Sequence, residues 1–196
     1  SPLLLTKLSC RRFFHAPLLK AAEFDVVGAL TTKPERKSAA VSDFPNITVV
    51  ESIDALIKLK LDLLVVASTN SAHASQAVAG LRAGVPVVVD KPMGRTLEET
   101  QEIIKVAKDL NVPVTTYFNR KWDSDALTIK KIIKEGILGN IFRLDSRFER
   151  FRPTITPSSW RENQTASEGG GNLLDLQPHL VSTALDWFGP AQLVTA

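Results

Sequence analysis

The 196-residue sequence predicts an α/β fold, in which a doubly wound parallel sheet is followed by part of an open α+β domain. Over residues 13–118, short apolar runs rich in β-branched residues alternate with segments of helical periodicity, as they do in α/β domains. The apolar runs have no polar face, which is typical of strands buried on both sides of a parallel sheet. After Gly139, apolar and polar residues alternate, which is typical of a half-buried strand in an antiparallel sheet.

The strands of the first domain are short and apolar, and we expect them at residues 24–30, 47–49, 62–68, 85–89 and 114–118. The helices of this domain carry apolar residues on one face, and we expect them at residues 16–22, 33–41, 53–58, 74–83 and 96–110. Gly84 is the expected C-cap of the helix that precedes it. Thr96 and Glu99 have the spacing of a capping box at the start of the next helix.

The second domain is expected to contain an amphipathic helix, an alternating strand, a long loop and a further helix. These segments are residues 124–134, 141–151, 152–168 and 172–188, in that order. Gly189-Pro190 is expected to end the last helix. We therefore divide the chain into a first domain, residues 1–122, and a partial second domain, residues 123–196.

The composition excludes several classes of protein. The chain has 24 Lys and Arg against 21 Asp and Glu, evenly spread, whereas a nucleic-acid-binding surface gathers its basic residues on one element. No apolar run reaches the roughly 18 residues that would span a membrane. The single cysteine, Cys10, allows no disulfide framework and no multi-thiolate metal site. We expect a cytoplasmic protein that binds neither nucleic acid, membrane nor metal.

Polar residues follow three successive strands of the predicted sheet. They are Ser68-Thr69-Asn70-x-x-His73, Asp90-Lys91-Pro92 and Asn119-Arg120. Open parallel sheets bind ligands outside the carboxyl ends of their strands, so these residues are candidates for a binding site, with ordinary turn chemistry as the alternative for each. Lys91 follows a triple valine and Asp90, at the end of the expected strand, where its ammonium could polarise a substrate oxygen or form a salt bridge with Asp90.

Asp175 and His179 lie four residues apart, which places them on one face of the helix expected there. An imidazole is suited to general acid-base catalysis near neutral pH, and a carboxylate one turn away can orient it. The alternative is a simple pair on the helix surface. A metal site is not expected, because two ligands without a nearby third are too few.

Two further segments have both a structural and a functional interpretation. His15 precedes the first helix, where we expect it to cap the helix or to pack against it. Trp160-Arg161 lies in the long loop, where the pair could clamp a ligand by stacking and charge. Alternatively, the indole anchors the loop.

Together these motifs resemble the Gfo/Idh/MocA family of NAD(P)-dependent oxidoreductases, named for glucose–fructose oxidoreductase and inositol dehydrogenase. The matching residues are Phe14-His15-Ala16-Pro17-Leu18-Leu19, Ser68-Thr69-Asn70-x-x-His73, Asp90-Lys91-Pro92-Met93, Asn119-Arg120 and Gly170-Gly171-x-x-x-Asp175-x-x-x-His179. The resemblance implies a Rossmann domain followed by an open-faced α+β domain, with the nicotinamide between them. Family members are usually much longer, so the resemblance also implies a chain truncated at both ends.

The resemblance implies roles for individual residues. Lys91 would contact the cofactor and the substrate hydroxyl, with Asp90 in place of the family's usual Glu. His179 would take the proton from a sugar or polyol hydroxyl as hydride passes to the nicotinamide, and Asp175 would bind the substrate or orient His179. The other residues carried over are expected at the cofactor, and they are Ser68, Thr69, Asn70, His73, Asn119, Arg120, Trp160 and Arg161.

The choice of cofactor can be argued from the strand expected at residues 24–30. The residues after it are Thr31-Thr32-Lys33-Pro34-Glu35-Arg36, with no acidic residue where a partner of the ribose 2′-hydroxyl is expected. Thr31 with Lys33 or Arg36 could instead hold a 2′-phosphate. This favours NADP, although the loop could also reach NAD.

Two departures from the family pattern bear on activity. The chain has no glycine before Gly28, although a glycine-rich turn normally cradles the pyrophosphate. Arg11 or Arg12 could pair with the phosphate instead. We therefore expect a first domain that lacks its first strand and glycine turn. Gln177 and Ser182 stand where the family usually has Gly and Asp, which alters the substrate pocket.

The leading hypothesis is an oxidoreductase that transfers hydride between NADP or NAD and a sugar, polyol or related hydroxy or carbonyl compound. The alternative is a catalytically silent family member or fragment that binds a sugar or a protein partner, which the missing glycine turn favours. A third hypothesis is a generic Rossmann-like binding domain, but the helix with Asp175 and His179 lies outside any Rossmann unit. A homo-oligomer is expected if the sheet of the second domain is completed.

Overall fold

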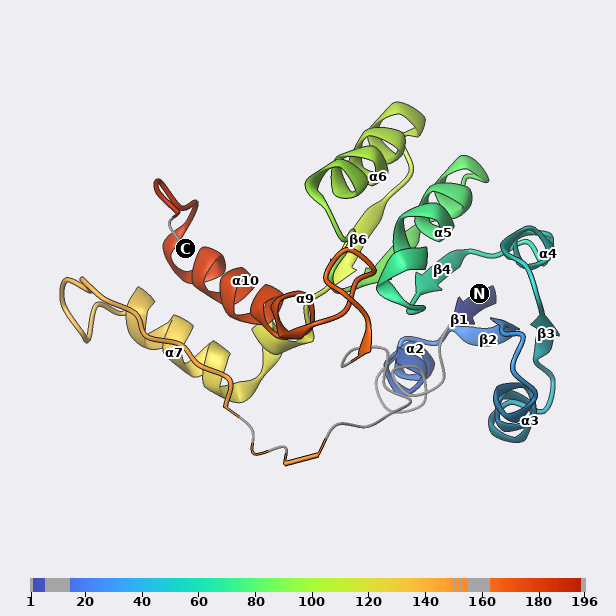
Figure 1. Cartoon of the computed structure of the whole chain (residues 1–196), viewed down its shortest axis with the longest axis horizontal. Coiled ribbons are helices and arrows are strands. Elements are labelled where there is room, and N and C mark those ends of the chain that lie inside the picture. Colours follow the sequence, from blue (N-terminus) through green and yellow to red (C-terminus); the bar gives the residue numbers. More distant parts are fainter. Residues whose placement is uncertain (1, 6–14, 150, 152, 155–162, 195–196) are drawn as a thin grey trace. The chain divides into compact units, whose positions relative to one another are not determined.

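The computed structural model describes residues 2–5, 15–149, 151, 153–154 and 163–194. The chain divides into two compact units, Ser1–Tyr117 and Phe118–Ala196, and each is described by itself. The first unit contains a six-stranded sheet in the order β3-β2-β1-β4-β5-β6, in which every pairing is parallel (Figure 1). This order is that of a Rossmann domain, and it confirms the predicted doubly wound α/β fold.

The strands of the first unit are short, and they are β1 (Pro2–Leu5), β2 (Asp25–Leu30), β3 (Thr48–Val50), β4 (Leu63–Val66), β5 (Val87–Asp90) and β6 (Val114–Tyr117). Its helices are α2 (Ala16–Ala21), α3 (Pro34–Asp43), α4 (Ile53–Ile57), α5 (Asn70–Arg82) and α6 (Leu97–Leu110). Most of them agree with the predicted ranges to within a few residues. α5 begins at Asn70 rather than at residue 74, so Asn70 and His73 belong to the start of this helix.

The expectation that the first domain lacks its first strand is wrong. Pro2–Leu5 forms β1, which pairs with β2 on one side and with β4 on the other and so occupies the middle of the sheet. A leading proline is compatible with this strand, because the missing N–H is tolerated at the first residue of a strand. The place where the glycine turn was expected, with Arg11 and Arg12, lies outside the described residues.

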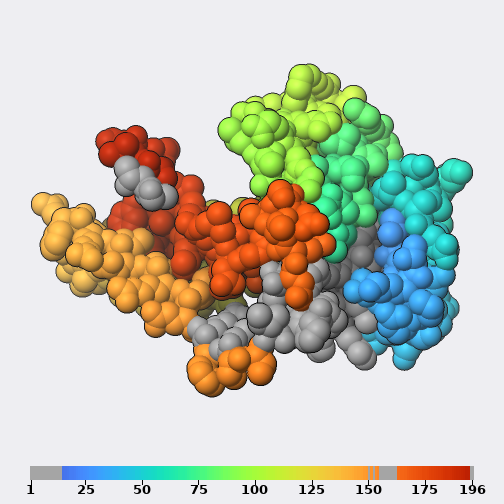
Figure 2. All heavy atoms as spheres, viewed as in Figure 1, coloured from blue at the N-terminus to red at the C-terminus, as the bar shows by residue number. Residues whose placement is uncertain are grey.

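Two hydrophobic clusters cover the two faces of the sheet, and the β4 region contributes to both. Leu64 and Val66 are buried in the larger cluster with residues of α4, α5 and α6. Val65 and Ala67 are buried in the smaller cluster with Ala16 of α2. α5 and α6 lie side by side on one face of the sheet (Figure 1), and the atoms of their segments adjoin in the space-filling view (Figure 2). Because alternate strand residues point to opposite faces, burial on both faces explains why these runs have no polar side.

The second unit is helical in the part that the structure describes. Its elements are the 3₁₀ helix η2 (Asn119–Trp122), α7 (Ser124–Lys134), α9 (Asn172–Asp175) and α10 (Gln177–Phe188). The strand predicted at residues 141–151 is wrong, because residues 141–149 form no strand and Phe142 is 97% exposed. A strand needs a neighbour whose backbone pairs with its N–H and C=O groups. The described residues of this unit supply no such neighbour.

The single helix predicted at residues 172–188 is also wrong, because it is broken at Leu176 (φ −110°, ψ −42°). Pro178 gives the physical reason. Proline has no N–H to donate to the carbonyl four residues earlier, that of Leu174, and its ring clashes with that carbonyl, whereas proline is tolerated in the first turn of a helix such as α10. Asp175 therefore ends α9, whereas His179 lies in the first turn of α10.

Candidate functional site

In the first unit, two of the predicted polar segments lie at the carboxyl edge of the sheet. β4 and β5 pair in parallel, with Val66 opposite Val89. The segments that follow them, Ser68-Thr69-Asn70 and Asp90-Lys91-Pro92, therefore leave the sheet from neighbouring strands. The third predicted segment, Asn119-Arg120, belongs to η2 of the second unit. Ligands of parallel sheets bind at this edge, so the first two segments form a candidate site on the first unit.

His73 links these two segments from within the fold. The residue is 1% exposed. Its Nδ1 lies 2.7 Å from the carbonyl oxygen of Pro92, and its Nε2 lies 3.3 Å from the carbonyl oxygen of Ser68. Because a carbonyl oxygen only accepts, the shorter contact indicates that Nδ1–H donates to Pro92. The imidazole is covered by protein, and it joins the residues that follow β4 to those that follow β5.

Lys91 directly follows β5, and its peptide bond to Pro92 is cis. The backbone N–H of Lys91 donates to Oδ1 of Asp90 over 3.0 Å. The other oxygen of this carboxylate, Oδ2, lies 3.9 Å from Nε2 of His15. His15 occupies the N-cap position of α2, makes no capping hydrogen bond with its side chain, and packs its ring on Tyr117 with 4.4 Å between the centroids. The packing role expected of His15 is therefore present, and the capping role is not.

The other residues predicted beside Lys91 are held by local hydrogen bonds. Asn70 is 5% exposed at the start of α5. The Ser68 hydroxyl donates to the carbonyl oxygen of Thr69 over 3.4 Å, and the Thr69 and Ser71 hydroxyl oxygens lie 3.2 Å apart. These contacts order the turn between β4 and α5, as Ser and Thr side chains commonly do.

The exit of β2 carries the residues expected to choose between NAD and NADP. Thr31 is buried, and its Oγ1 accepts a hydrogen bond from the backbone N–H of Lys33 over 3.3 Å. Lys33 is exposed at the N-cap position of α3, and Arg36 is half-buried in the first turn. Two cationic side chains at the start of a helix make this exit favourable for an anionic group.

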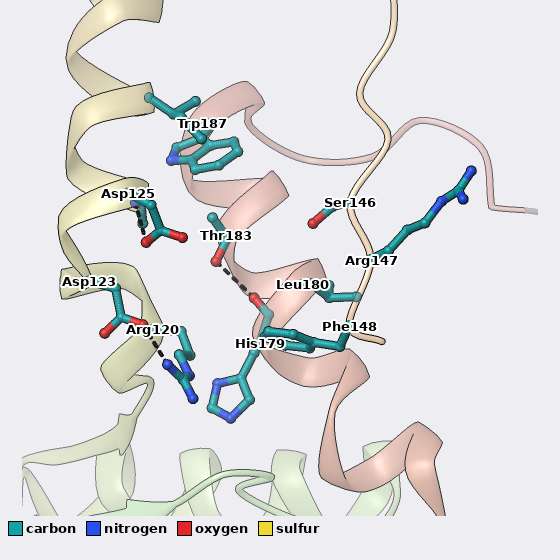
Figure 3. Close-up of a pocket in the computed structure, with 12 residues that line it drawn as sticks. Arg120, Asp123, Asp125, Ser146, Arg147, Phe148, His179, Leu180, Thr183 and Trp187 are labelled. Carbon is teal, nitrogen blue, oxygen red and sulfur yellow. Dashed lines mark hydrogen bonds and ion pairs between the residues drawn. The ribbon is translucent and has the colours of Figure 1, made fainter. Parts of the chain in front are cut away.

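The second unit contains a pocket of about 200 Å³, drawn in Figure 3. It is lined by residues of η2, α7, α10 and the segment 146–148, and they are Arg120, Asp123, Asp125, Ala126, Ile129, Ser146, Arg147, Phe148, His179, Leu180, Thr183 and Trp187. Two residues predicted from the sequence, Arg120 and His179, therefore line the same cavity. Figure 3 shows them close together near Phe148.

Phe148 connects Arg120 and His179. The guanidinium carbon of Arg120 lies 6.0 Å from the centre of the Phe148 ring. The same ring packs edge-on against His179, with centroids 6.3 Å apart and planes at 90°. Arg120 also donates to the Asp123 carboxylate over 2.8 Å, and the His179 carbonyl accepts from the Thr183 hydroxyl over 2.9 Å. The pocket thus presents a cation, an aromatic ring and an imidazole on one wall.

Phe148 and Thr183 line this pocket but were not predicted from the sequence as site residues. Phe148 lies on the apolar side of the alternating segment after Gly139, so its apolar character was visible but its neighbours were not. Asp175 does not line the pocket, because the break at Leu176 places it on α9. The predicted pair Trp160-Arg161 lies outside the described residues.

An ion pair joins the two long helices of the second unit. Lys130 of α7 donates to Asp186 of α10 over 2.8 Å, and this hydrogen bond holds the pKa of Asp186 below its ordinary value. Solvent-exposed pairs contribute up to about 1 kcal/mol. Because the pKa of Asp186 is lower in the folded state, ionisation of this carboxyl group stabilises the fold. The contribution is complete above the unfolded-state pKa of about 3.9 and is lost as the pH falls through the folded-state pKa.

We expect Asp186→Asn to lower the free energy of unfolding by up to about 1 kcal/mol at pH 7, because it removes this ion pair. The difference should be smaller at pH 3, because the carboxyl group of the unfolded chain is then mostly protonated and the lowered pKa of the folded state no longer gives its full stability. Urea unfolding of the chain and of the variant at the two pH values measures it. Lys130→Met should give a loss of the same sign at pH 7, and a difference that does not depend on pH would contradict the assignment.

Two classes of site are absent from the part of the chain that the structure describes. No group of three His, Cys, Asp or Glu residues there could hold a metal ion. None of the helices in these residues is both long and apolar enough for a membrane span.

Comparison with known proteins gives matches over both units. Residues 9–118 match the family model described as "Oxidoreductase family, NAD-binding Rossmann fold", and residues 126–196 match the GFO/IDH/MocA C-terminal domain. The chain is 38% identical over 177 residues to the oxidoreductase YdgJ of Escherichia coli, covering 90% of this chain and 50% of that protein. It is 34% identical over 185 residues to the scyllo-inositol 2-dehydrogenase (NADP(+)) IolW of Bacillus subtilis, covering 93% of this chain and 50% of that protein.

A solved structure agrees with these matches. The oxidoreductase yvaA of Bacillus subtilis superposes with a TM-score of 0.84 at 30% identity, covering 100% of this chain and 57% of that one. The chain spans about half the length of the curated relatives that it matches. Family models cover most of the chain, and the strand order of the first unit is the one that such a family requires. The chain therefore belongs to the Gfo/Idh/MocA family of oxidoreductases, whose first domain is an NAD-binding Rossmann fold.

Proposed function

We propose that the protein is an oxidoreductase that transfers hydride between NADP and a sugar, polyol or related hydroxy or carbonyl compound. The observation that carries the proposal is the position of Lys91 directly after β5, at the sheet edge where a nicotinamide-dependent family binds its ligands. The name of the relative IolW, a scyllo-inositol dehydrogenase, supports a polyol as the substrate class.

In this proposal the chain's own residues bind the substrate and move its proton. The bound nicotinamide supplies or accepts the hydride. Lys91 donates a hydrogen bond to the substrate oxygen and polarises it. His179 holds the proton exchanged with that oxygen, and Asp175 binds the substrate or orients the imidazole. Arg120 helps to shape the wall beside His179 through its contact with Phe148.

Polar groups along the sheet edge fit a nicotinamide cofactor. Ser68, Thr69 and Asn70 lie between β4 and the start of α5, in the turn that leaves the sheet beside Lys91. Hydroxyl and amide groups can pair with the ribose and amide groups of such a cofactor. We assign these three residues, with Asn119 of η2, to cofactor binding.

The exit of β2 supports NADP over NAD. Lys33 and Arg36 bring two positive charges to the start of α3, and phosphate groups bind well where cations and helix N-terminal N–H groups combine. The carboxylate in the same turn is Glu35, which offers the alternative of accepting a hydrogen bond from a ribose hydroxyl. The relative IolW is named as NADP-dependent, which also supports NADP.

We expect the chain to bind NADPH, and we expect Lys33→Ala and Arg36→Ala each to raise the Kd for NADPH about tenfold. Each variant removes a charge-assisted hydrogen bond, a class worth about 1.5–3 kcal/mol. Quenching of tryptophan fluorescence during titration with NADPH and with NADH measures both affinities. Lys37→Ala is the matched control, because Lys37 lies on the same helix and is already paired with Glu51.

Two outcomes would contradict these assignments. If Glu35→Gln weakened NADH binding while the variants of Lys33 and Arg36 left NADPH binding unchanged, the cofactor would be NAD. If neither cofactor bound at millimolar concentration, this chain would not be an oxidoreductase.

A catalytically silent family member that binds a sugar or a protein is the second candidate function. The absence of any glycine before Gly28 favours it, because the pyrophosphate is normally held by a glycine-rich turn. Turnover of a polyol panel that is lost in Lys91→Ala and in His179→Ala would exclude this candidate.

A further inference from the structure

The residues on both sides of Lys91 are each contacted by a buried histidine. His15 Nε2 lies 3.9 Å from the carboxylate of Asp90, and His73 Nδ1 lies 2.7 Å from the carbonyl oxygen of Pro92. We propose that His15 and His73 are positioning residues, which hold the segment from Asp90 to Pro92 and thereby fix the direction of the Lys91 side chain. The inference rests on the proposed function in one respect only, namely that Lys91 binds the substrate oxygen.

His73 acts on the Pro92 side of the segment. Its ring is buried at the start of α5 and also contacts the Ser68 carbonyl, 3.3 Å from Nε2. A side chain that bridges the exits of two strands restrains both, since either exit can move only by giving up a buried contact. Losing such a contact is costly, because a buried polar group without a partner keeps its full desolvation penalty.

His15 acts on the Asp90 side. It is 3% exposed, and its ring packs on Tyr117 with planes at 53°. Tyr117 pairs with Asp90 across β5 and β6, so the buried imidazole lies against two half-buried residues of neighbouring strands. Nε2 of His15 has no hydrogen-bond partner among the described residues, and the Asp90 carboxylate stands at ion-pair distance from it. A small shift would therefore bring Nε2 of His15 within hydrogen-bond distance of the Asp90 carboxylate.

Asp90 transmits the restraint to Lys91. One carboxylate oxygen faces His15, and the other accepts the backbone N–H of Lys91 over 3.0 Å. Rotation of this carboxylate away from His15 would break its contact with Lys91 as well. The Lys91 backbone is thus fixed at its N–H by Asp90 and, one residue later, at the Pro92 carbonyl by His73. A side chain with four rotatable bonds can be aimed reliably only from a fixed backbone.

The test observes Lys91 directly, with no cofactor or substrate present. The full chain is labelled with ¹³C at the lysine ε-carbons, and the NMR signal of Lys91 is assigned by its loss in Lys91→Arg. His15→Phe and His73→Leu keep a buried apolar side chain but remove the ring nitrogens. We expect each to move the Lys91 signal by more than its linewidth.

Conservative variants separate positioning from packing. A glutamine amide can replace the Nε2 donor of histidine and an asparagine amide can replace the Nδ1 donor. His15→Gln should therefore return the Lys91 signal toward its original position, because Nε2 faces Asp90. For His73 the rescue should come from His73→Asn and not from His73→Gln, because Nδ1 contacts Pro92.

Leu81→Ala is the matched control for loss of packing. Leu81 is fully buried on the same helix as His73, and we expect its truncation to lower stability without moving the Lys91 signal. The proposal is overturned if the histidine variants leave the signal unmoved, or if Leu81→Ala moves it equally. If His15→Phe or His73→Leu does not fold, the comparison of His73→Asn with His73→Gln tests the proposal. The proposal holds if only His73→Gln moves the Lys91 signal, and it is overturned if the two variants give the same signal. Failure here leaves the NADPH titration unaffected, so it is distinct from failure of the proposed function.

Discussion

Lys91→Met is expected to lower kcat about 10²–10³-fold while leaving the fold intact, because that is the usual cost of removing one preorganised hydrogen-bond donor from the reacting oxygen. Methionine keeps a long apolar stem and removes the ammonium. The contacts that order the segment belong to the Lys91 backbone N–H and to the Pro92 carbonyl, so they survive the substitution. Steady-state kinetics with NADPH or NADP and a polyol panel measures the effect.

The control for this experiment is Lys105→Met on α6. Lys105 is exposed and paired with Asp109 one turn away on the same helix, so its loss should leave kcat unchanged. A Lys91→Met protein with a kcat close to that of the parent chain would contradict the role of Lys91. NADPH affinity measured in parallel would show whether a loss arises in binding or in turnover.

His179→Gln is expected to lower kcat by about 10²–10⁴-fold near neutral pH, the range for loss of a general acid or base. The deficit should shrink as the pH rises, because solvent base then takes over the proton transfer. Glutamine leaves the His179 carbonyl available to the Thr183 hydroxyl, so the helix keeps this contact. A pH profile of kcat for the parent chain and the variant measures the expected change.

Val181→Ala is the control on α10. Val181 lies two residues from His179 and is 46% exposed, so its truncation tests for a general effect of altering this helix. We expect it to keep the parent pH profile. If His179→Gln also kept the parent kcat across the pH range, His179 would not be the acid-base group.

The first unit could be predicted from the sequence because each element carries its own signal in consecutive residues. The runs around Leu64 and Val88 are apolar on both sides, and Thr96 with Glu99 marks where α6 begins. β1 was not predicted, because no glycine turn follows its short leucine run, although this run has the same apolar character as the other strands of the sheet.

The remaining errors differ in origin. The break at Leu176 is local, and Pro178 could have predicted it. The strand expected after Gly139 depends on a neighbouring strand with which its backbone can pair. The alternating pattern of residues 141–151 does not show whether such a neighbour is present. The contact of His73 with Pro92 joins residues 19 positions apart, and it depends on the register of β4 and β5. No local pattern contains this information.

The interruption between α9 and α10 places Asp175 and His179, for which we propose different roles, on two separate helices. On one continuous helix, Asp175 and His179 would lie at a fixed distance, so a movement of the helix that shifted one side chain would also shift the other. In this protein Asp175 ends a four-residue turn that begins after Gly171, and His179 begins a separate helix. Under the roles that we propose for Asp175 and His179, a substitution that shifts α9 alters substrate binding while the imidazole keeps its place on α10.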